Sequence, residues 1–201
     1  MRSVLMRVAA LVLAGGPLAG CGAMIGTPNF AAGGFVTSFA EPGLAGDAAV
    51  DPTYRRQIVA APKGYAPGTI VIDTADRFLY LVQDDGKAIR YGVGVGREGF
   101  LWHGTAKIGR KEEWPGWTPP PQMLKRQPDL PRHMDGGPDN PLGARAMYLY
   151  QGGRDTLFRI HGSNEPWTIG HAVSSGCIRM VNQDVIDLYS RVSDGTKVVV
   201  L

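Results

Sequence analysis

Two apolar segments joined by a turn signal constrain the fold more than any other part of the chain. In the segment 77–83 (RFLYLVQ), apolar residues occupy both sets of alternate positions, which predicts a strand buried on both faces. The segment 84–86 (DDG) favours a tight turn, and the segment 87–95 (KAIRYGVGV) is then the returning strand. Its glycine spacing, at positions 92, 94 and 96, leaves one face bare, so another backbone or a ligand can approach there.

Other segments continue the strand-rich pattern. β-Branched and aromatic residues bounded by turn signals predict further strands at residues 69–73, 144–151, 156–160 and 196–201. The glycine-rich stretch 92–99 (GVGVGREG) does not open a helix, as a nucleotide-binding glycine loop does, and a strand fits it better. We therefore expect a mainly β domain of the β-rich α+β type.

The segment 182–192 (NQDVIDLYSRV) has the clearest helical pattern. Asn182 suits an N-cap, and Asp184 suits the first turn of a helix. The apolar residues of its predicted buried stripe are Val185, Ile186, Tyr189 and Val192. One main helix is therefore expected, directly before the last strand.

Residues 97–143 differ from the rest of the chain. They hold eight of the fifteen prolines and three of the four tryptophans. The stretches 114–123 (WPGWTPPPQM) and 134–143 (MDGGPDNPLG) predict no regular elements. Because aromatic residues are rare in disordered segments, we expect an ordered loop region that caps a cleft. The alternative is that Trp102, Trp114 and Trp117 only anchor this region to the core.

The start of the chain has the pattern of a targeting segment. Arg2 and Arg7 precede an apolar stretch, residues 8–20, that is too short and too rich in glycine to span a bilayer well. This stretch ends in LAGC, which resembles the lipobox of bacterial lipoproteins and implies that the thiol of Cys21 is lipidated and the chain cleaved before it. The alternative is an ordinary signal peptide, with Cys21 incidental.

Three segments follow from this pattern: a signal peptide at residues 1–20, a lipidated cysteine with a Gly/Ala/Pro-rich tether at residues 21–53, and one domain at residues 54–201. Loss of the signal peptide removes two arginines and no acid, so 19 Lys and Arg remain against 18 Asp and Glu. The chain has no run of basic residues, so nucleic-acid binding has no support.

Cys177 has no partner within the chain if Cys21 carries lipid. An odd cysteine in an oxidising compartment indicates either an intermolecular disulfide or a reactive thiol, and a buried inert cysteine is the alternative. Gly176 allows a sharp turn, so the N–H groups of Ser175, Gly176 and Cys177 can point into one space, as an oxyanion site requires. Arg179 adds positive charge that favours a thiolate.

A cysteine nucleophile also needs a base, which the four histidines supply as candidates. His103 and His133 lie in the proline-rich region and are interpreted as surface or packing residues. His171 lies six residues before the cysteine, and His161 lies sixteen before it, at the end of a predicted strand. Spacing alone favours neither of the two. A zinc site made of both histidines and Cys177 would have only three ligands, so neither a metal nor a cofactor is expected.

The segment 159–200 (RIHGSNEPWTIGHAVSSGCIRMVNQDVIDLYSRVSDGTKVVV) resembles the signature of the L,D-transpeptidase catalytic domain family. The pattern is HG, about a dozen residues, S-x-G-C-[IV]-R-[ML], and then a helix with Asn and Asp. The stretches GGPDNPLGARAMYLY and IVIDTADRFLYLVQ also resemble this family, so the likeness covers roughly residues 55–201. It implies a β-sandwich or barrel with one main helix after the cysteine motif and a long Pro/Trp-rich capping region.

The resemblance also implies a role for each matching residue. Cys177 would be the nucleophile and His161 its base, with the carbonyl of Gly162 holding the imidazole tautomer. Ser175 and Gly176 would complete the oxyanion site. Substrate-binding roles would fall to Arg179, which supports the site or holds a substrate carboxylate, and to Trp167.

The implied activity is that of a peptidoglycan L,D-transpeptidase. The cysteine would attack the stem tetrapeptide before its terminal D-Ala, form a thioester, and pass the acyl group to an amine. The expected partners are peptidoglycan stem peptides and, through the lipid anchor, a membrane; the expected state is a monomer in the periplasm. The alternatives are an L,D-carboxypeptidase at the same site and a non-catalytic wall-binding lipoprotein. No histidine follows Cys177, which excludes the Cys-before-His order of papain-like peptidases.

Overall fold

The computed structural model describes residues 50–201. The predicted signal peptide, Cys21 and residues 22–49 of the predicted tether lie outside the described residues. The end of that tether is described and belongs to the packed domain, because Val50 is buried in a cluster with Ile169 and Val181. No helix in this part of the chain combines the length and apolar character that crossing a membrane requires.

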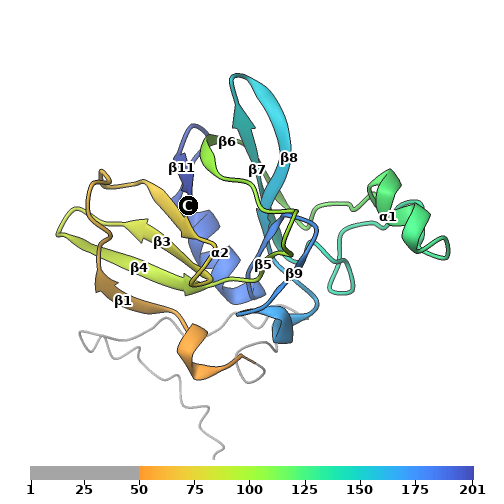
Figure 1. The fold of residues 1–201 in the computed structure, drawn as a ribbon, viewed down its shortest axis with the longest axis horizontal. Helices are drawn as coiled ribbons and strands as arrows, with labels where there is room; N and C mark the ends of the chain where they lie inside the picture. The colour runs from red at the N-terminus through yellow and green to blue at the C-terminus, as the bar shows by residue number, and fades with distance from the viewer. Residues whose placement is uncertain (1–49) are drawn as a thin grey trace, which may run out of the picture. The chain divides into compact units, whose positions relative to one another are not determined.

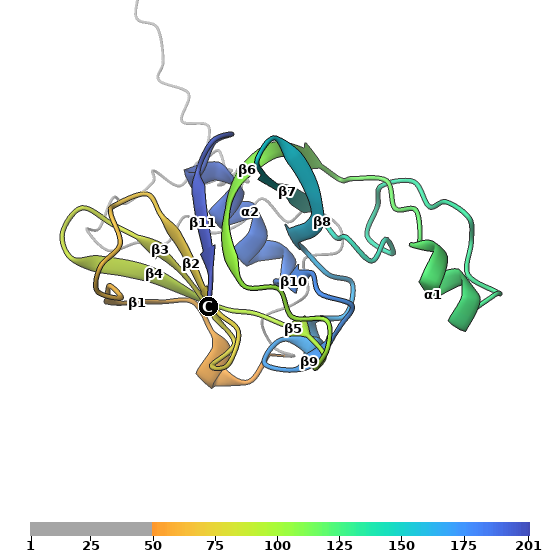
Figure 2. The ribbon, with the colours of Figure 1, turned by 45° about the horizontal axis from the view of Figure 1, so that its top comes forward.

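Most of the strands in the described chain form one sheet, which bends around a helix (Figures 1 and 2). Within residues 50–201 the strand order is β1-β4-β3-β2-β11-β6-β7-β8-β10. Neighbouring strands are antiparallel except for two parallel pairs, β2 with β11 and β8 with β10. The strands are β1 (Gln57–Ala60), β2 (Ile70–Asp73), β3 (Phe78–Val82), β4 (Lys87–Gly92), β6 (Gly104–Glu113), β7 (Arg145–Gln151), β8 (Arg154–His161), β10 (Ile178–Arg179) and β11 (Lys197–Val200).

The remaining elements are short, apart from one helix. The strands β5 (Val95–Gly96) and β9 (Ala172–Ser174) pair in parallel as a small second sheet. The helices are η2 (Pro52–Tyr54), α1 (Pro121–Arg126), η3 (Pro166–Thr168) and α2 (Asn182–Arg191). The predicted mainly β fold with one main helix after the cysteine motif is confirmed.

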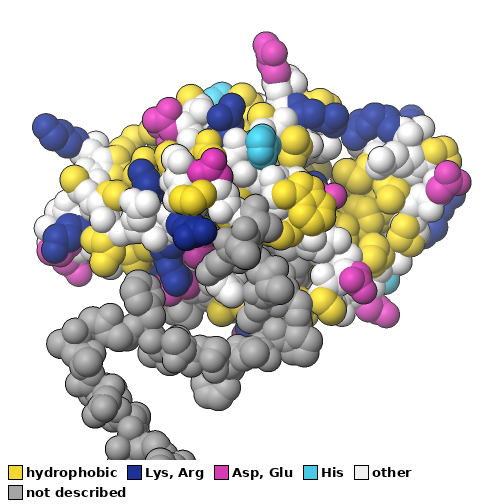
Figure 3. Space-filling view, turned by 90° about the horizontal axis from the view of Figure 1, so that it is seen from below, with side chains coloured by type: hydrophobic (Ala, Val, Ile, Leu, Met, Phe, Trp, Pro, Cys, Tyr) yellow, Lys and Arg dark blue, Asp and Glu magenta, His cyan; other side chains and the backbone are white. Residues whose placement is uncertain are grey.

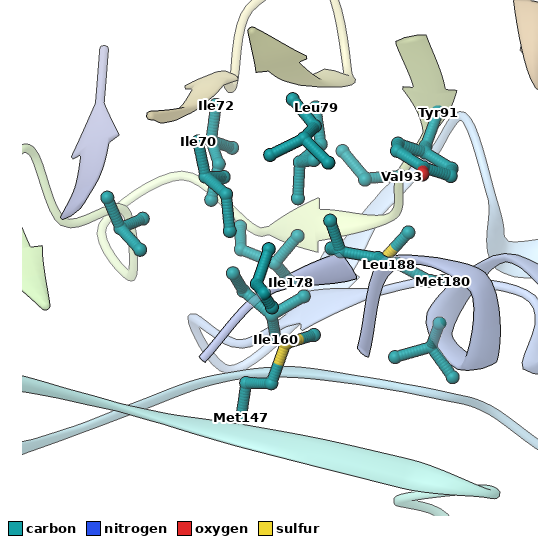
Figure 4. Packing of buried hydrophobic residues seen from close by; sticks show 14 of the residues in the cluster. Ile70, Ile72, Leu79, Tyr91, Val93, Met147, Ile160, Ile178, Met180 and Leu188 are labelled. Carbon is teal, nitrogen blue, oxygen red and sulfur yellow. The ribbon is translucent and has the colours of Figure 1, made fainter. Parts of the chain in front are cut away.

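One hydrophobic core lies between the two halves of the bent sheet. Figure 1 shows β1, β3 and β4 on one side, β6, β7 and β8 on the other, and α2 between them. In Figure 4, Ile70 and Leu79 from the first half face Met147 and Ile160 from the second, with Leu188 of α2 beside them. Each buried aliphatic side chain of this kind contributes about 1.5–3 kcal/mol to folding, so the core holds both halves in place.

The strand at residues 77–83 was predicted to be buried on both faces, but in the structure β2 has this property and β3 does not. In β2, Ile70, Val71 and Ile72 are all buried, whereas in β3 only one face and the last residue are. Phe78, on the outer face of β3, is half-buried under the guanidinium of Arg90, 4.1 Å from its ring centre. Tyr54 of η2 also packs on Phe78, with the ring centroids 5.4 Å apart, so within residues 50–201 single side chains cover this face of β3.

α2 begins one residue earlier than the predicted cap requires. Asn182 is the first residue of the helix, and Val181, at the N-cap, makes no side-chain capping bond. The Asn182 side chain is buried and accepts hydrogen bonds from backbone groups of other segments, which replaces the predicted capping role. As predicted, Val185 of α2 and Val192, which follows the helix, belong to the core, and Tyr189 packs against it. Leu188 is also in the core, whereas Ile186 of the predicted stripe is only half-buried.

Residues 97–143 contain more regular structure than their composition predicts. The ten-residue strand β6 runs between β11 and β7 in the middle of the sheet. Its inner face has only Ala106 and Ile108 as buried apolar residues, so the sequence pattern is weak and the strand depends on pairing with its neighbours. α1 begins within a stretch predicted to be irregular, because Pro121 at its first position has the backbone angle that a helix needs.

Residues 114–143 form an arm that stands apart from the sheets and carries α1 (Figures 1 and 2). Trp117 and Met134 close its base by exchanging two backbone hydrogen bonds of 2.8 Å. The buried side chain of Asn140 also donates to the carbonyls of Pro115 and Asp135, at 3.1 and 2.9 Å. Hydrophobic side chains gather on the side of the molecule that carries the arm (Figure 3).

We expect Leu188→Ala to lower the free energy of unfolding by about 2–5 kcal/mol, because it removes a fully buried side chain and leaves a cavity. Leu157→Ala is the matched control, since Leu157 is 74% exposed and its loss should cost less than about 0.5 kcal/mol. Urea unfolding followed by tryptophan fluorescence measures both changes. Equal costs for the two substitutions would contradict the assigned core.

Candidate active site

A short parallel strand pair brings the two predicted catalytic residues to the same end of the sheet. His161 is the last residue of β8, and in the pairing with β10 it lies opposite Arg179. The N–H of Met180 donates to the carbonyl of His161 at 2.8 Å. Cys177 directly precedes β10, which pairs with β8, and the backbone of Arg159 in β8 acts to lower the pKa of its thiol. Of these two residues, which lie sixteen positions apart in the sequence, one therefore ends β8 and the other directly precedes its neighbour β10.

The imidazole of His161 is buried and oriented by the backbone. Its Nδ1 lies 2.5 Å from the carbonyl oxygen of Gly162. A carbonyl can only accept, so Nδ1 carries the proton and Nε2 keeps a lone pair. Burial, together with the charge of Arg179, lowers the pKa of His161 to about 4, against the opposing effect of the Gly162 carbonyl. His161 is therefore neutral at pH 7.

Burial and the neighbouring arginines have opposite effects on the pKa of the Cys177 thiol. Burial raises the pKa of Cys177, while the backbone of Arg159 and the charges of Arg159 and Arg179 lower it. Arg179 acts in the predicted direction, but burial outweighs it, so the resting cysteine is a protonated thiol. The site therefore holds a neutral thiol and a neutral imidazole.

The turn before Cys177 admits only glycine at position 176. Gly176 has a φ of 116°, and a Cβ there would lie 2.5 Å from the ring of Phe158. Ser174 closes this turn, since its hydroxyl accepts from the N–H of Gly176 at 3.1 Å and donates to the carbonyl of Cys177 at 2.7 Å. Of the predicted oxyanion donors, Gly176 is thus already bonded within the turn, while Ser175 is exposed.

Arg179 lies beside the pair, with its guanidinium on an acidic neighbour. Its Nη1 donates to Oε2 of Glu165 at 2.7 Å, and its backbone exchanges two hydrogen bonds with Gly94, at 2.9 and 2.8 Å. A Cβ at position 94 would lie 2.8 Å from the carbonyl oxygen of Thr168, so only glycine permits this approach. The predicted bare face of the glycine-spaced strand is therefore confirmed, and other backbone segments fill it.

Trp167 and His171 line one cavity on the surface. Trp167, on η3, is 61% exposed. Together with His171, Tyr54 and Arg77 it lines a cavity of about 480 Å³ whose lining includes neither Cys177 nor His161. The substrate-binding role of Trp167 stays a prediction.

Sequence reasoning missed three residues that shape the site. Arg159 lies two positions before His161 on β8. Because residues two apart in a strand point to the same face, the sequence could have predicted that Arg159 lies near His161. Glu165, the partner of Arg179, and Ser174, which closes the turn, had no signal, because their contacts are specific to the fold. In residues 50–201, no three His, Cys, Asp or Glu side chains are grouped so as to hold a metal ion.

The sequence matches a known family and its curated members. The family model described as "L,D-transpeptidase catalytic domain" (YkuD) matches residues 67–200. "Probable L,D-transpeptidase ErfK/SrfK" of Escherichia coli (strain K12) is 38% identical over 141 residues, which is 66% of this chain and 43% of that protein. "Probable L,D-transpeptidase YbiS" of the same strain is 37% identical over 138 residues, 64% of this chain and 43% of that protein. The chain therefore spans less than half the length of these relatives.

Two solved structures are similar in fold. One, named "Probable carnitine operon oxidoreductase caia" from Brucella melitensis, is 54% identical with a TM-score of 0.52, covering 76% of this chain and 97% of that one. L,D-transpeptidase 3 from Mycobacterium tuberculosis is 16% identical with a TM-score of 0.51, covering 66% of this chain and 60% of that one, so it shows a shared fold. Because the family model covers most of the described residues and the fold agrees, the chain belongs to the L,D-transpeptidase catalytic domain family.

Proposed function

We propose that the chain is a peptidoglycan L,D-transpeptidase in which Cys177 is the nucleophile and His161 the base. The observation that carries this proposal is the pairing of β10 with β8, which sets the cysteine motif against the strand that ends in His161. The hydrogen bond to Gly162 supports it, because it leaves the lone pair of Nε2 for proton transfer.

Acylation begins from the neutral pair. The thiol proton of Cys177 moves to Nε2 of His161 as the sulfur attacks the stem-peptide carbonyl that precedes the terminal D-Ala. The carbonyl oxygen becomes an oxyanion near the turn before β10, where the backbone N–H groups of Ser175 and Cys177 are the candidate donors because that of Gly176 is bonded to Ser174. When this intermediate collapses, the C–N bond breaks and the D-Ala amine leaves with the proton from His161, so the acyl group remains as a thioester on Cys177.

Deacylation repeats these steps with a new nucleophile. An acceptor amine attacks the thioester and gives its proton to His161, the C–S bond breaks, and the proton returns to the sulfur. Transfer to an amine makes a crosslink or attaches a protein; attack by water would make the same site an L,D-carboxypeptidase. The positive charges of Arg159 and Arg179 stabilise the negative charge that develops on sulfur, which burial alone would disfavour.

The similar Brucella melitensis structure is named as an oxidoreductase. In this chain, the glycine-rich residues 92–99 are the stretch to compare with the dinucleotide-binding loop of such an enzyme. Residues 92–99 are rich in glycine, but they run from β4 into β5 and open no helix, whereas a dinucleotide-binding loop places phosphates at a helix N-terminus. The paired cysteine and histidine motifs favour acyl transfer for this chain.

The cellular setting belongs to the same proposal. The LAGC tetrad at Cys21 supports export and a lipid anchor, with the catalytic domain in the periplasm facing peptidoglycan. A tether at residues 22–49 would let the domain reach the wall from a membrane. Substrate binding is assigned to the arm, whose base adjoins the site: Nδ2 of Asn164 donates to the carbonyl of Asp139 at 2.9 Å.

The first test is covalent trapping. Soluble residues 22–201 incubated with a disaccharide-tetrapeptide, and separately with a carbapenem, should show an adduct by intact mass spectrometry. Cys177→Ala should show none, because it lacks the sulfur. A wild-type protein that forms no adduct would favour the non-catalytic alternative, and the released products separate transfer from hydrolysis.

The second test is the pH dependence of acylation. Because the base must be neutral and the pKa of His161 is about 4, the wild-type rate should persist to about pH 5, below the ordinary range of histidine. Arg179→Gln removes a positive charge, so the pKa of His161 rises and the acid limb moves to higher pH. Arg179→Lys keeps the charge and should keep the limb. Identical limbs in the Gln and Lys variants would contradict this electrostatic role.

The third test concerns the arm. Replacing residues 118–133 with a short Gly/Ser linker keeps the closed base at Trp117 and Met134 and removes α1. If the arm caps the donor stem, kcat/KM for the tetrapeptide should fall while the melting temperature changes little. Unchanged kinetics in the folded variant would show that the arm does not contact the donor.

A further inference from the structure

The side chain of Asn182 connects two loops that meet at the candidate active site. It is 6% exposed and belongs to the first turn of α2. Its Oδ1 accepts from the N–H of Ala144 at 2.9 Å and from the N–H of Ser163 at 3.2 Å. Ala144 follows the arm directly, and Ser163 follows His161 and Gly162. One carboxamide oxygen thus joins the base of the arm to the loop that carries the histidine.

Two glycines show how closely this oxygen is held. A Cβ at Gly143 or at Gly162 would collide with Oδ1 of Asn182, so both backbones approach it as only glycine can. Gly143 also has a φ of 63°, which favours glycine independently. The carboxamide therefore has a fixed position, set by backbone on both sides.

The peptide group between Gly162 and Ser163 links the carboxamide of Asn182 to the ring of His161. Its N–H donates to Asn182, and its C=O accepts from Nδ1 of His161. Because a peptide group is planar, fixing the N–H also fixes the direction of the carbonyl. The two hydrogen bonds form one chain, in which each polarises the next.

We propose that Asn182 is a positioning residue that fixes the ring orientation and tautomer of His161 through the Gly162–Ser163 peptide. This inference rests on the proposed role of His161 as base. Asn182 touches no reacting atom; its effect is to keep the Nε2 lone pair directed at the thiol. Without the acceptor, the peptide can rotate, the Nδ1 hydrogen bond weakens, and the ring samples unproductive orientations.

The test compares three substitutions in the chain of residues 22–201, with carbapenem acylation of Cys177 as the readout. Asn182→Ala removes the acceptor and should lower the acylation rate roughly 10- to 100-fold, as loss of an orienting partner does elsewhere. Asn182→Asp keeps an acceptor oxygen and adds negative charge, so it should retain most of the rate while its acid limb moves to higher pH. Thr74→Ala removes another buried hydrogen bond, to the carbonyl of Leu201, and controls for general destabilisation.

A second readout is independent of activity. NMR of the His161 ring should show a protonated Nδ1 in the wild type and the Asp variant, and a mixture of tautomers in Asn182→Ala. If Asn182→Ala does not fold, the Asp variant decides: an acid limb identical to that of the wild type, or loss of the protonated Nδ1, would overturn the proposal. A folded Asn182→Ala with wild-type rate and tautomer would also overturn it, while wild-type adduct formation would leave the proposed function intact.

Discussion

The candidate active site depends on a parallel strand pairing of only two residues. β10 joins the free edge of β8, and this register sets Cys177 against the strand that ends in His161. The backbone of Arg179 also exchanges two hydrogen bonds with Gly94, which follows β4. The cysteine motif is therefore held between the two halves of the bent sheet, and any change in their separation would move the thiol relative to its base.

Burial decides the charge state of the site against the local arginines. Two guanidinium groups lie near enough to favour a thiolate, yet the pKa of Cys177 is raised and that of His161 is lowered. Both shifts have desolvation as their largest cause, and both favour uncharged groups. The arginines act on the charge that appears during the reaction, because the resting pair has none.

The sequence predicted those parts of the fold whose signal is local. β2, the β3–β4 hairpin, β7, β8 and α2 all follow from short-range pattern, as does the family of the cysteine motif. β6 did not, because most of its residues are polar and its stability comes from two neighbouring strands far away in sequence. The same reason explains Asn182: its residue type suits a helix cap, but the backbone groups that it bonds belong to loops 38 and 19 positions away. The sequence therefore predicted which residues belong to the site, but not the hydrogen-bond partners of their side chains, which are far away in the sequence.

The protonated state of Cys177 has a consequence for the chemical durability of the protein. Oxidants and disulfides react with thiolates, and a thiol that burial keeps protonated reacts slowly with both. The wall-facing compartment that we propose is oxidising, and the described part of the chain contains no second cysteine to form a bridge with it. Desolvation therefore lengthens the lifetime of the reduced nucleophile, while the base beside it supplies reactivity when a substrate is bound.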